Sequence, residues 1–245
     1  NKGICSYISR IKHQMKVQAN VKSSASKPLP AAETAPGGKA EQDAQYFETV
    51  IIGTGFSGLL AAIRLQKKHF NDFVLLERSA ELGGTWQINS YPGAEVDIPT
   101  SLYSISFVPY PFRKTFAPQS ELLAYTNHII DKYDLRKKAK TNQTVTSLTY
   151  EENACLWHVE TASGERYTAR FIIDTSGVLA NPHIPNIKGA ESFTGPIFHA
   201  GHWDHSVSYA GNRVGVIGSG CSGAQIVPAM AGKVSKLTLF MGKAQ

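Results

Sequence analysis

The stretch VIIGTGFSG, residues 50–58, decides the fold of this 245-residue chain. It opens with a β-branched apolar run that is typical of a buried strand, and Gly53, Gly55 and Gly58 follow at G-x-G-x-x-G spacing. Residues 59–65 continue as an apolar periodic segment, which predicts a helix. The first glycine permits a tight turn, the second leaves room for a pyrophosphate, and the third lets the helix pack against the strand. This order predicts a dinucleotide-binding turn.

The residues after the glycines support that prediction. Residues 73–76 form a second apolar run that ends on Glu77, with Arg78 next. An acidic side chain at the end of the second strand can accept hydrogen bonds from a ribose diol. The intervening helix would direct unpaired N–H groups and the positive end of its dipole at phosphate. The alternative is a glycine-rich turn that binds nothing, and it does not account for this order of strand, helix and acid.

Composition limits the class of protein. Hydrophobic residues make up 42% of the chain and charged residues 18%, which are values of a soluble globular protein. The net charge of +6 comes from residues 1–27, which hold six lysines and arginines and no acid, whereas the remaining 19 basic residues balance 19 acidic ones. The folded part therefore shows no electrostatic footprint for nucleic acid, and we expect no nucleic-acid partner.

The cysteines and the hydropathy indicate the compartment. Cys5, Cys155 and Cys221 are too few and too scattered for a disulfide framework or a zinc site, so we expect a reducing compartment, the cytoplasm, and no metal. No apolar run approaches the roughly 18 residues that a membrane span needs. We therefore expect a soluble protein without a membrane partner.

The N-terminal segment differs in composition from the rest of the chain. Residues 1–45 are rich in Lys, Ser, Ala, Gln and Pro, which predicts a disordered basic and polar extension. An organelle-targeting segment is the alternative, although Arg10 is the only arginine in it. Met15 is a candidate natural start.

The middle of the chain predicts one helix and three strands. Residues 99–118 are proline-rich and predict irregular structure, after which apolar residues at helical spacing predict a helix over 118–133. Alternating patterns predict strands at 145–150, 156–161 and 166–173, a small β-meander that leads back into the nucleotide sheet.

A second glycine-rich stretch, RVGVIGSGCSG, occupies residues 213–223. Gly218, Gly220 and Gly223 repeat the first spacing after a strand, and residues 224–231 predict a helix that Pro228 would shorten or bend. Residues 236–240 predict the next strand. Two dinucleotide sites in one chain imply a tightly held flavin and a diffusible nicotinamide, which together relay a hydride.

These segments together predict an α/β fold with two Rossmann-like (doubly wound) dinucleotide-binding domains, a small β-meander insertion, and a truncated second domain. We expect the first nucleotide-binding domain over residues 46–180, a linker over 181–211, and the start of the second domain over 212–245.

Two longer patterns identify a family. Residues 83–97 read GGTWQINSYPGAEVD, with Gly83, Gly84, Trp86, Tyr91, Pro92, Gly93 and Asp97 at the spacing [A/G]-G-x-W-x-x-x-x-[F/Y]-P-[G/M]-x-x-x-D. The second, residues 193–204, has Phe193, Gly195, His199, Trp203 and Asp204 at the spacing F-x-G-x-x-x-H-x-x-x-W-[P/D]. With both patterns present, residues 46–240 resemble the Baeyer–Villiger monooxygenases, the class B flavoprotein monooxygenases.

The resemblance implies FAD and NADPH as cofactors, with insertion of one oxygen atom of O2 next to a ketone carbonyl to give an ester or lactone. The positions it assigns to FAD are Gly53, Gly55, Phe56, Ser57, Gly58, Glu77, Arg78, Gly84, Thr85, Trp86 and Asp97. The positions it assigns to NADPH are Gly218, Ser219, Gly220, Cys221, Ser222 and Gly223. Asp97 is the catalytic candidate, because its counterpart orients a catalytic arginine. His199 and Trp203 would lie in the segment that joins the domains, with Phe193, Gly195 and Asp204.

Two departures from the family pattern leave alternatives open. The family's catalytic arginine follows the second nucleotide strand at a distance that exceeds this chain. Gly242 also stands where an arginine usually grips the 2′-phosphate of NADPH, so NADH is an alternative. A flavin-containing or N-hydroxylating monooxygenase and a truncated, inactive nucleotide-binding product are the alternative functions. A disulfide-type flavin reductase is disfavoured because the sequence has no C-x-x-C.

Overall fold

The computed structural model describes residues 44–179 and 181–242. The extension predicted for residues 1–45 lies outside the described residues apart from its last two positions, as does Cys5. The elements in chain order are β1 (Gln45–Ile52), α2 (Phe56–Lys67), β2 (Phe73–Leu76), α3 (Thr85–Ile88), α4 (Thr100–Tyr103), α5 (Gln119–Lys132), η1 (Leu135–Lys138), β3 (Ala139–Lys140), β4 (Val145–Glu151), β5 (Leu156–Thr161), β6 (Arg166–Asp174), η2 (Ala190–Ser192), η3 (Ala200–His202), β7 (Arg213–Ile217), α6 (Cys221–Ala231) and β8 (Lys236–Phe240).

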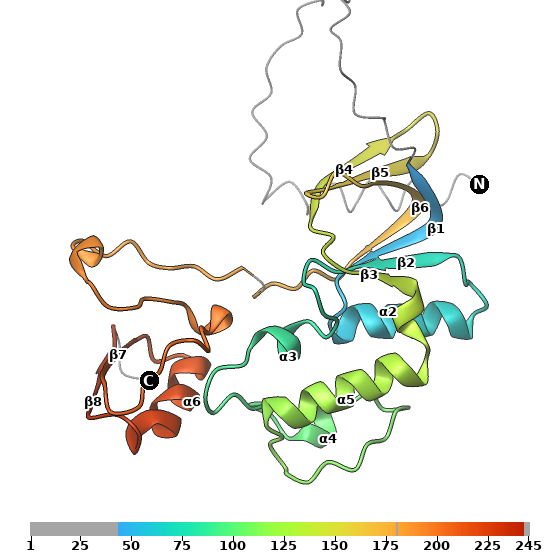
Figure 1. Cartoon of the computed structure of the whole chain (residues 1–245). Helices are drawn as coiled ribbons and strands as arrows, with labels where there is room; N and C mark the ends of the chain where they lie inside the picture. Colours follow the sequence, from blue (N-terminus) through green and yellow to red (C-terminus); the bar gives the residue numbers. More distant parts are fainter. Residues whose placement is uncertain (1–43, 180, 243–245) are drawn as a thin grey trace, which may run out of the picture. The chain divides into compact units, whose positions relative to one another are not determined.

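Six strands form one mixed sheet in the order β3-β2-β1-β6-β5-β4. β1 pairs in parallel with β2 on one side and with β6 on the other, and β2 pairs in parallel with β3. β5 is antiparallel to both β4 and β6. The sheet is therefore a parallel nucleotide-binding type at one edge and an antiparallel meander at the other (Figure 1).

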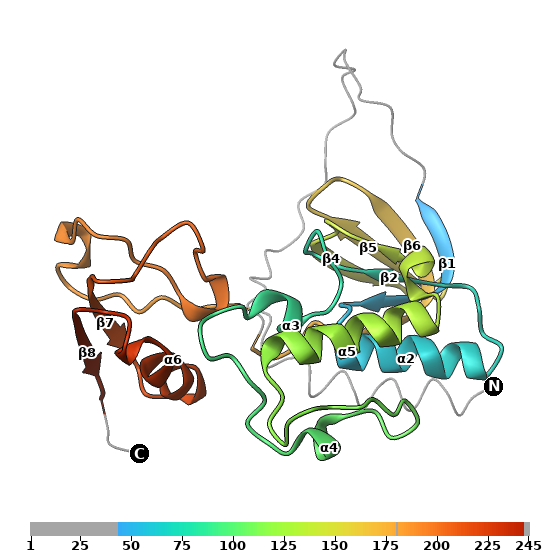
Figure 2. The ribbon, with the colours of Figure 1, turned by 60° about the horizontal axis from the view of Figure 1, so that its bottom comes forward.

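The two faces of the sheet carry separate apolar cores. Ile51 and Leu75 pack with Leu59 of α2 and Ile129 of α5, which lie on the same side of the sheet (Figures 1 and 2). Their chain neighbours, among them Val50, turn to the opposite face, where they pack with residues of β5 and β6. Because successive strand residues alternate between faces, an unbroken apolar run such as β2, whose four residues are all buried, is what a strand buried on both faces requires.

The β-meander leads back into the nucleotide sheet, as the sequence predicts, and the two share the strand β6. β6 is one continuous strand: residues 166–169 pair with β5, while the whole strand from Tyr167 to Asp174 pairs with β1. The predicted bounds of β2, β5 and β8 are confirmed. Within the proline-rich segment, the structure adds one helical turn, α4, to the irregular backbone that was expected.

The second glycine-rich stretch forms a smaller β-α-β unit. β7 and β8 pair in parallel from Arg213 with Lys236 to Ile217 with Phe240, and α6 connects them with Pro228 inside it. Ile217 is 63% exposed and Phe240 56% exposed. The unit therefore has little core of its own, and Ile226 and Met230 are its buried residues among those described.

None of the helices in the described part of the chain is both long enough and apolar enough to cross a bilayer.

Candidate functional site

The turn between β1 and α2 can be made only with glycine at two positions. Gly53 has φ +98°, a conformation that L side chains rarely adopt, and its N–H donates to Leu76 O of the neighbouring strand at 2.8 Å. A Cβ on Gly58 would lie 2.1 Å from Gly53 O and 2.9 Å from Thr175 Oγ1. The helix can therefore approach the strand this closely only while residue 58 lacks a side chain.

The first turn of α2 presents unpaired backbone donors. The first helical hydrogen bond runs from Leu59 N to Gly55 O at 3.0 Å, so the N–H groups of Phe56, Ser57 and Gly58 have no partner inside the helix. Within this helix no acidic residue occupies the first turn and no side chain caps it. A Cβ added to Gly55 would meet nothing closer than Gly84 Cα at 3.7 Å. The turn is a cradle with room for an anion, as a dinucleotide pyrophosphate requires.

Glu77 is buried against this turn. Its side chain is 4% exposed, and its Oε2 accepts hydrogen bonds from Thr54 N at 3.0 Å and Thr54 Oγ1 at 2.5 Å. Its Oε1 accepts from Ser79 N at 2.9 Å. The sequence predicts a ribose contact for this carboxylate; what the structure shows is that the carboxylate holds Thr54 in the glycine turn. Arg78, next in sequence, donates to Asn181 Oδ1 at 2.8 Å.

The loop of residues 83–97, called the signature loop below, packs on the same turn. Gly84 has φ +58°, and a Cβ on it would lie 2.5 Å from Gly55 Cα. Gly83 N donates to Thr54 Oγ1 at 3.3 Å. The two glycines therefore bring the loop into backbone contact with the middle of the first glycine motif. Thr85, at the start of α3, is exposed beside them.

Trp86 and Asp97, both in this loop, influence Tyr103 in different ways. Trp86 is 8% exposed, and its Nε1–H donates to Tyr103 OH at 3.1 Å. Burial raises the pKa of Tyr103, the hydrogen bond from Trp86 opposes that rise, and the negative charge of Asp97 adds to it. The Asp97 side chain itself is exposed. Trp86 is therefore a residue of the core, and Asp97 is exposed to solvent.

The side chain of Phe56 is part of the core and not of the cradle. Its ring packs against Tyr103 with centroids 5.2 Å apart and edge-on against Tyr125 at 5.7 Å. Ser57 is exposed. Of these two predicted cofactor positions, Phe56 offers a ligand its backbone N–H, and Ser57 offers its N–H and its hydroxyl.

The second glycine turn repeats the geometry of the first. Gly218 has φ +106°, its N–H donates to Phe240 O at 2.9 Å, and a Cβ on Gly223 would lie 2.3 Å from Gly218 O. Gly220 precedes α6 with φ −67° and ψ −178°, close to −69° and −178° at Gly55. Two copies of one backbone design therefore lead into α2 and α6.

The second turn is more open than the first. The first bond of α6 runs from Ala224 N to Gly220 O at 2.9 Å, which leaves the N–H groups of Cys221, Ser222 and Gly223 without helical partners. No described atom lies within 4 Å of a Cβ built on Gly218 or Gly220. Cys221 is exposed, and Ser219 and Ser222 are half-buried.

The fingerprint of residues 193–204 forms short local contacts. His199 Nδ1 accepts from Gly201 N at 3.0 Å, and the Trp203 ring packs edge-on against Phe198 with centroids 5.1 Å apart. Asp204 accepts from Ser206 N at 2.9 Å and from Ser206 Oγ at 2.6 Å, and these hydrogen bonds lower its pKa. Phe193, 62% exposed, lies over Gly195, where a Cβ would meet its ring at 2.6 Å.

The structure brings the signature loop together with the second glycine unit. Ser90 Oγ lies 2.7 Å from His205 Nε2, one residue after the fingerprint, and Tyr91 OH donates to Gln225 Oε1 of α6 at 2.9 Å. One loop therefore contacts the turn that precedes α2 and the helix that follows the second turn.

The sequence did not single out Thr54 or Thr175. Thr54 is fully buried and joins Glu77 to Gly83, as described above. Thr175 Oγ1 donates to Ile52 O at 2.7 Å, and a Cβ on Gly53 would lie 2.7 Å from Thr175 O. A threonine within two residues of a strand end is the local signal that could have identified both.

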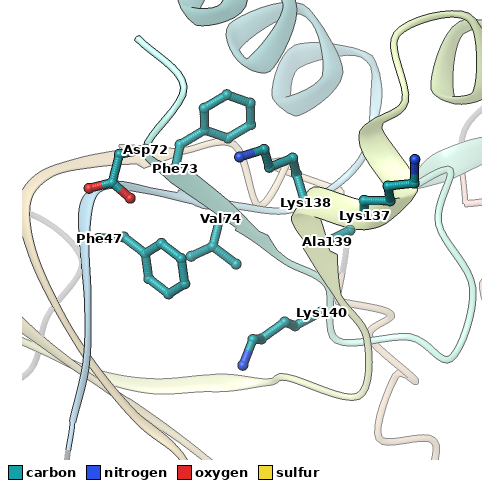
Figure 3. Close-up of a pocket in the computed structure, with 8 residues that line it drawn as sticks. All are labelled: Phe47, Asp72, Phe73, Val74, Lys137, Lys138, Ala139 and Lys140. Atoms are coloured by element: carbon teal, nitrogen blue, oxygen red, sulfur yellow. The ribbon is translucent and has the colours of Figure 1, made fainter.

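A pocket of about 180 Å³ lies at the start of β2 and β3, away from both glycine turns (Figure 3). Its lining residues are Phe47, Asp72, Phe73, Val74, Lys137, Lys138, Ala139 and Lys140. Each ammonium group already has a partner: Lys137 pairs with an aspartate at 2.8 Å, Lys138 donates to a main-chain oxygen at 2.8 Å, and Lys140 donates to a glutamine at 2.8 Å. Ligands of such sheets bind at the carboxyl ends of the strands, so this pocket is not the nucleotide site.

Over residues 44–179 and 181–242, no three His, Cys, Asp or Glu side chains are grouped to hold a metal ion.

Comparison with known proteins identifies the family. The family model described as pyridine nucleotide-disulphide oxidoreductase matches residues 50–245. The sequence has no C-x-x-C, and in the described part of the chain Cys155 and Cys221 are free thiols.

Curated relatives are similar over most of this chain. A Baeyer–Villiger monooxygenase of Streptomyces coelicolor is 41% identical over 82% of this chain and 38% of its own length. One of Pseudomonas aeruginosa is 40% identical over 80% of this chain and 38% of its own length. A phenazine N-monooxygenase of Lysobacter antibioticus is 33% identical over 84% of this chain and 39% of its own length. The chain thus spans under two fifths of the length of these relatives.

Solved structures agree. The crystal structure of cyclohexanone monooxygenase from Rhodococcus sp. Phi1 bound to NADP+ superposes with a TM-score of 0.79 and 34% identity, covering 83% of this chain and 39% of that one.

We predict that Glu77→Gln destabilises the fold by about 1–3 kcal/mol, because a carboxamide has one oxygen to offer where the carboxylate accepts from Thr54 N, Thr54 Oγ1 and Ser79 N. Urea denaturation of both proteins measures the difference. Glu81→Gln, at an exposed position on the same segment, is the control and should change stability by less than about 0.5 kcal/mol. Equal effects of the two substitutions would contradict the role given to Glu77.

Proposed function

Because the chain belongs to the pyridine nucleotide-disulphide oxidoreductase family, we propose that it is the nucleotide-binding part of an FAD- and NADPH-dependent monooxygenase of the Baeyer–Villiger type. Such an enzyme inserts one oxygen atom of O2 next to a ketone carbonyl to give an ester or lactone, and the other oxygen atom leaves as water. The observation that carries the proposal is the signature loop, which contacts the first glycine turn through Gly84 and the second unit through Tyr91.

The first turn fits the pyrophosphate of FAD. Unpaired N–H groups at Phe56, Ser57 and Gly58 face an opening that a Cβ on Gly55 would enter, and the helix dipole favours negative charge there. We assign the ribose to Glu77, whose Oε1 accepts only one hydrogen bond among those described. The redox chemistry with NADPH and O2 is what bound FAD would supply at this site.

We assign NADPH to the second turn. The N–H groups of Cys221, Ser222 and Gly223 are as free as those of α2, and the absence of described atoms around Gly218 and Gly220 leaves space for a ligand. The nicotinamide cofactor is expected to bind less tightly than FAD, because the second turn is contacted on fewer sides. NADH remains the alternative cofactor.

Asp97 would act at the flavin through another residue. Its exposed carboxylate stands near the Trp86–Tyr103 pair, which is anchored in the core. A carboxylate so placed can orient a guanidinium and neutralise its charge, as the family resemblance implies for the catalytic arginine. The substrates would be a small-molecule ketone and O2, and the protein would work in the cytoplasm without nucleic acid or membrane as a partner.

Oxidation at nitrogen is the second candidate function. It is favoured by the similarity to a phenazine N-monooxygenase, at 33% identity over 84% of this chain. The signature loop with Asp97 favours the ketone reaction. Product analysis of the complete protein with a cyclic ketone and with a phenazine would separate the two. The third possibility is a nucleotide-binding product without catalysis. Such a protein would oxidise no NADPH in the presence of the ketone or of the phenazine.

We predict that Gly55→Ala strongly weakens FAD binding while leaving the fold intact. The new Cβ would stand in the cradle but only 3.7 Å from Gly84 Cα, an ordinary contact. Quenching of flavin fluorescence on titration with the protein measures affinity, and thermal unfolding measures stability. We expect at least about a hundredfold loss of affinity, or about 2.7 kcal/mol.

The matched control for this experiment is Gly232→Ala. A Cβ on Gly232 meets no described atom within 4 Å, and this residue follows α6 at its far end from the glycine turn. It should bind FAD as the unchanged chain does. If Gly55→Ala also binds FAD normally, the turn before α2 is not the pyrophosphate site.

We predict that Gly242→Arg raises the preference for NADP+ over NAD+ about tenfold, since a guanidinium can bind a 2′-phosphate in bidentate fashion. A side chain fits here without collision, as no described atom lies within 4 Å of a Cβ on Gly242. Calorimetric titration with each nucleotide gives the ratio of affinities. An unchanged ratio would show that this strand end does not face the ribose of the nicotinamide cofactor.

A further inference from the structure

The carboxamide of Gln225 in α6 forms hydrogen bonds with three atoms of the signature loop. Its Oε1 accepts from Tyr91 OH at 2.9 Å and from Glu95 N at 3.4 Å, and its Nε2–H donates to Glu95 O at 2.9 Å. A single side chain thus pairs with both the donor and the acceptor of one residue in the loop. That two-way pairing fixes the orientation of the amide as well as its position.

The backbone of the signature loop also lies close to the backbone of α6 at this contact. Gly93 has φ +82°, and a Cβ on it would lie 2.5 Å from Gln225 O and 2.9 Å from Ala229 Cβ. Only glycine permits this approach. The turn of residues 91–95 is therefore seated on α6, and Gln225 holds it there.

The other side of the loop is fixed to α5. Gln119 N, at the first residue of α5, donates to Ala94 O at 2.8 Å, and Val96 N donates to Ala117 O at 3.1 Å. Asp97 follows Val96 directly. The segment that leads into Asp97 is thus held between a backbone contact with α5 and a side-chain contact with α6.

Gln225 also follows directly after Ala224, whose N–H makes the first hydrogen bond of α6. The N–H groups at positions 221–223, just before it, have no partner inside the helix. The same turn of helix therefore offers N–H groups to a nucleotide and a carboxamide to the loop. We propose that Gln225 is a positioning residue that couples a dinucleotide at the start of α6 to the segment carrying Asp97. The inference rests on the proposed second nucleotide site.

The coupling has a thermodynamic consequence. A ligand that orders the first turn of α6 reduces the freedom of Gln225 and hence of the loop, and the loop in turn favours the ordered helix. In the unchanged chain, NADP+ should therefore slow amide exchange at residues 93–97 as well as at 218–224.

Hydrogen exchange read by mass spectrometry tests this in the whole chain, with Gln225→Ala and Gln225→Glu compared. Without nucleotide, Gln225→Ala should speed exchange at residues 93–97 about tenfold, since local opening loses bonds worth about 1.4 kcal/mol. Gln225→Glu keeps the size and the acceptor but loses the donor to Glu95 O, so it should show a smaller increase of the same kind.

Gln66→Ala is the matched control, because Gln66 Nε2 donates from α2 to a main-chain oxygen, Tyr133 O, at 3.2 Å. It should leave exchange at residues 93–97 unchanged. If Gln225 contributed only to general stability, Gln66→Ala and Gln225→Ala variants with the same melting temperature would show the same change in exchange rate at residues 93–97. That result would overturn the proposal.

Adding NADP+ separates this inference from the proposed function. Protection at 218–224 and 93–97 in the unchanged chain, with protection at 93–97 lost in Gln225→Ala, supports the coupling. Protection at 218–224 alone in the unchanged chain overturns it. If NADP+ protects neither region, the second nucleotide site and with it the coupling fail, while the nucleotide-free comparison still decides whether Gln225 positions the loop.

Discussion

The first turn of α2 lies against the carbonyl oxygen of Gly53, so closely that a Cβ at position 58 would stand 2.1 Å from that oxygen. This approach sets where the unpaired N–H groups of the helix point, because the turn allows no other path between strand and helix. The same constraint recurs in the second turn, where a Cβ on Gly223 would lie 2.3 Å from Gly218 O. Two turns with the same unpaired helix N–H groups therefore follow from one steric condition applied twice, and such groups are suited to bind an anion.

The signature loop connects these turns, and its spacing has a physical reason. Gly84 at one end meets Gly55, and Gly93 near the other meets the backbone of α6. Both contacts are backbone to backbone, so both need glycine. Trp86 between them is buried and fixes the loop to the core, while Asp97 is exposed to solvent. The spacing of residues 83–97 thus places two glycines at backbone contacts and one tryptophan in the core.

The sequence was sufficient where the signal is local. The strands β2, β5 and β8 have the predicted bounds, because each is an apolar or alternating run ended by turn residues. It was insufficient where pairing decides. β3 has two residues and exists because it pairs with β2, and the prediction that the meander leads back into the nucleotide sheet did not reveal that β6 pairs with β1 and β5 at the same time. The contact of Gln225 with Glu95 spans 130 positions, and no local pattern announces it.

FAD binding at the turn before α2 is the central claim about this chain. The most direct measurement is the visible absorption spectrum of the purified, extensively desalted chain, with its flavin content compared to protein concentration. We expect a yellow protein with one FAD per chain. A folded chain that is colourless, and that stays colourless after incubation with FAD and a second desalting, would contradict it.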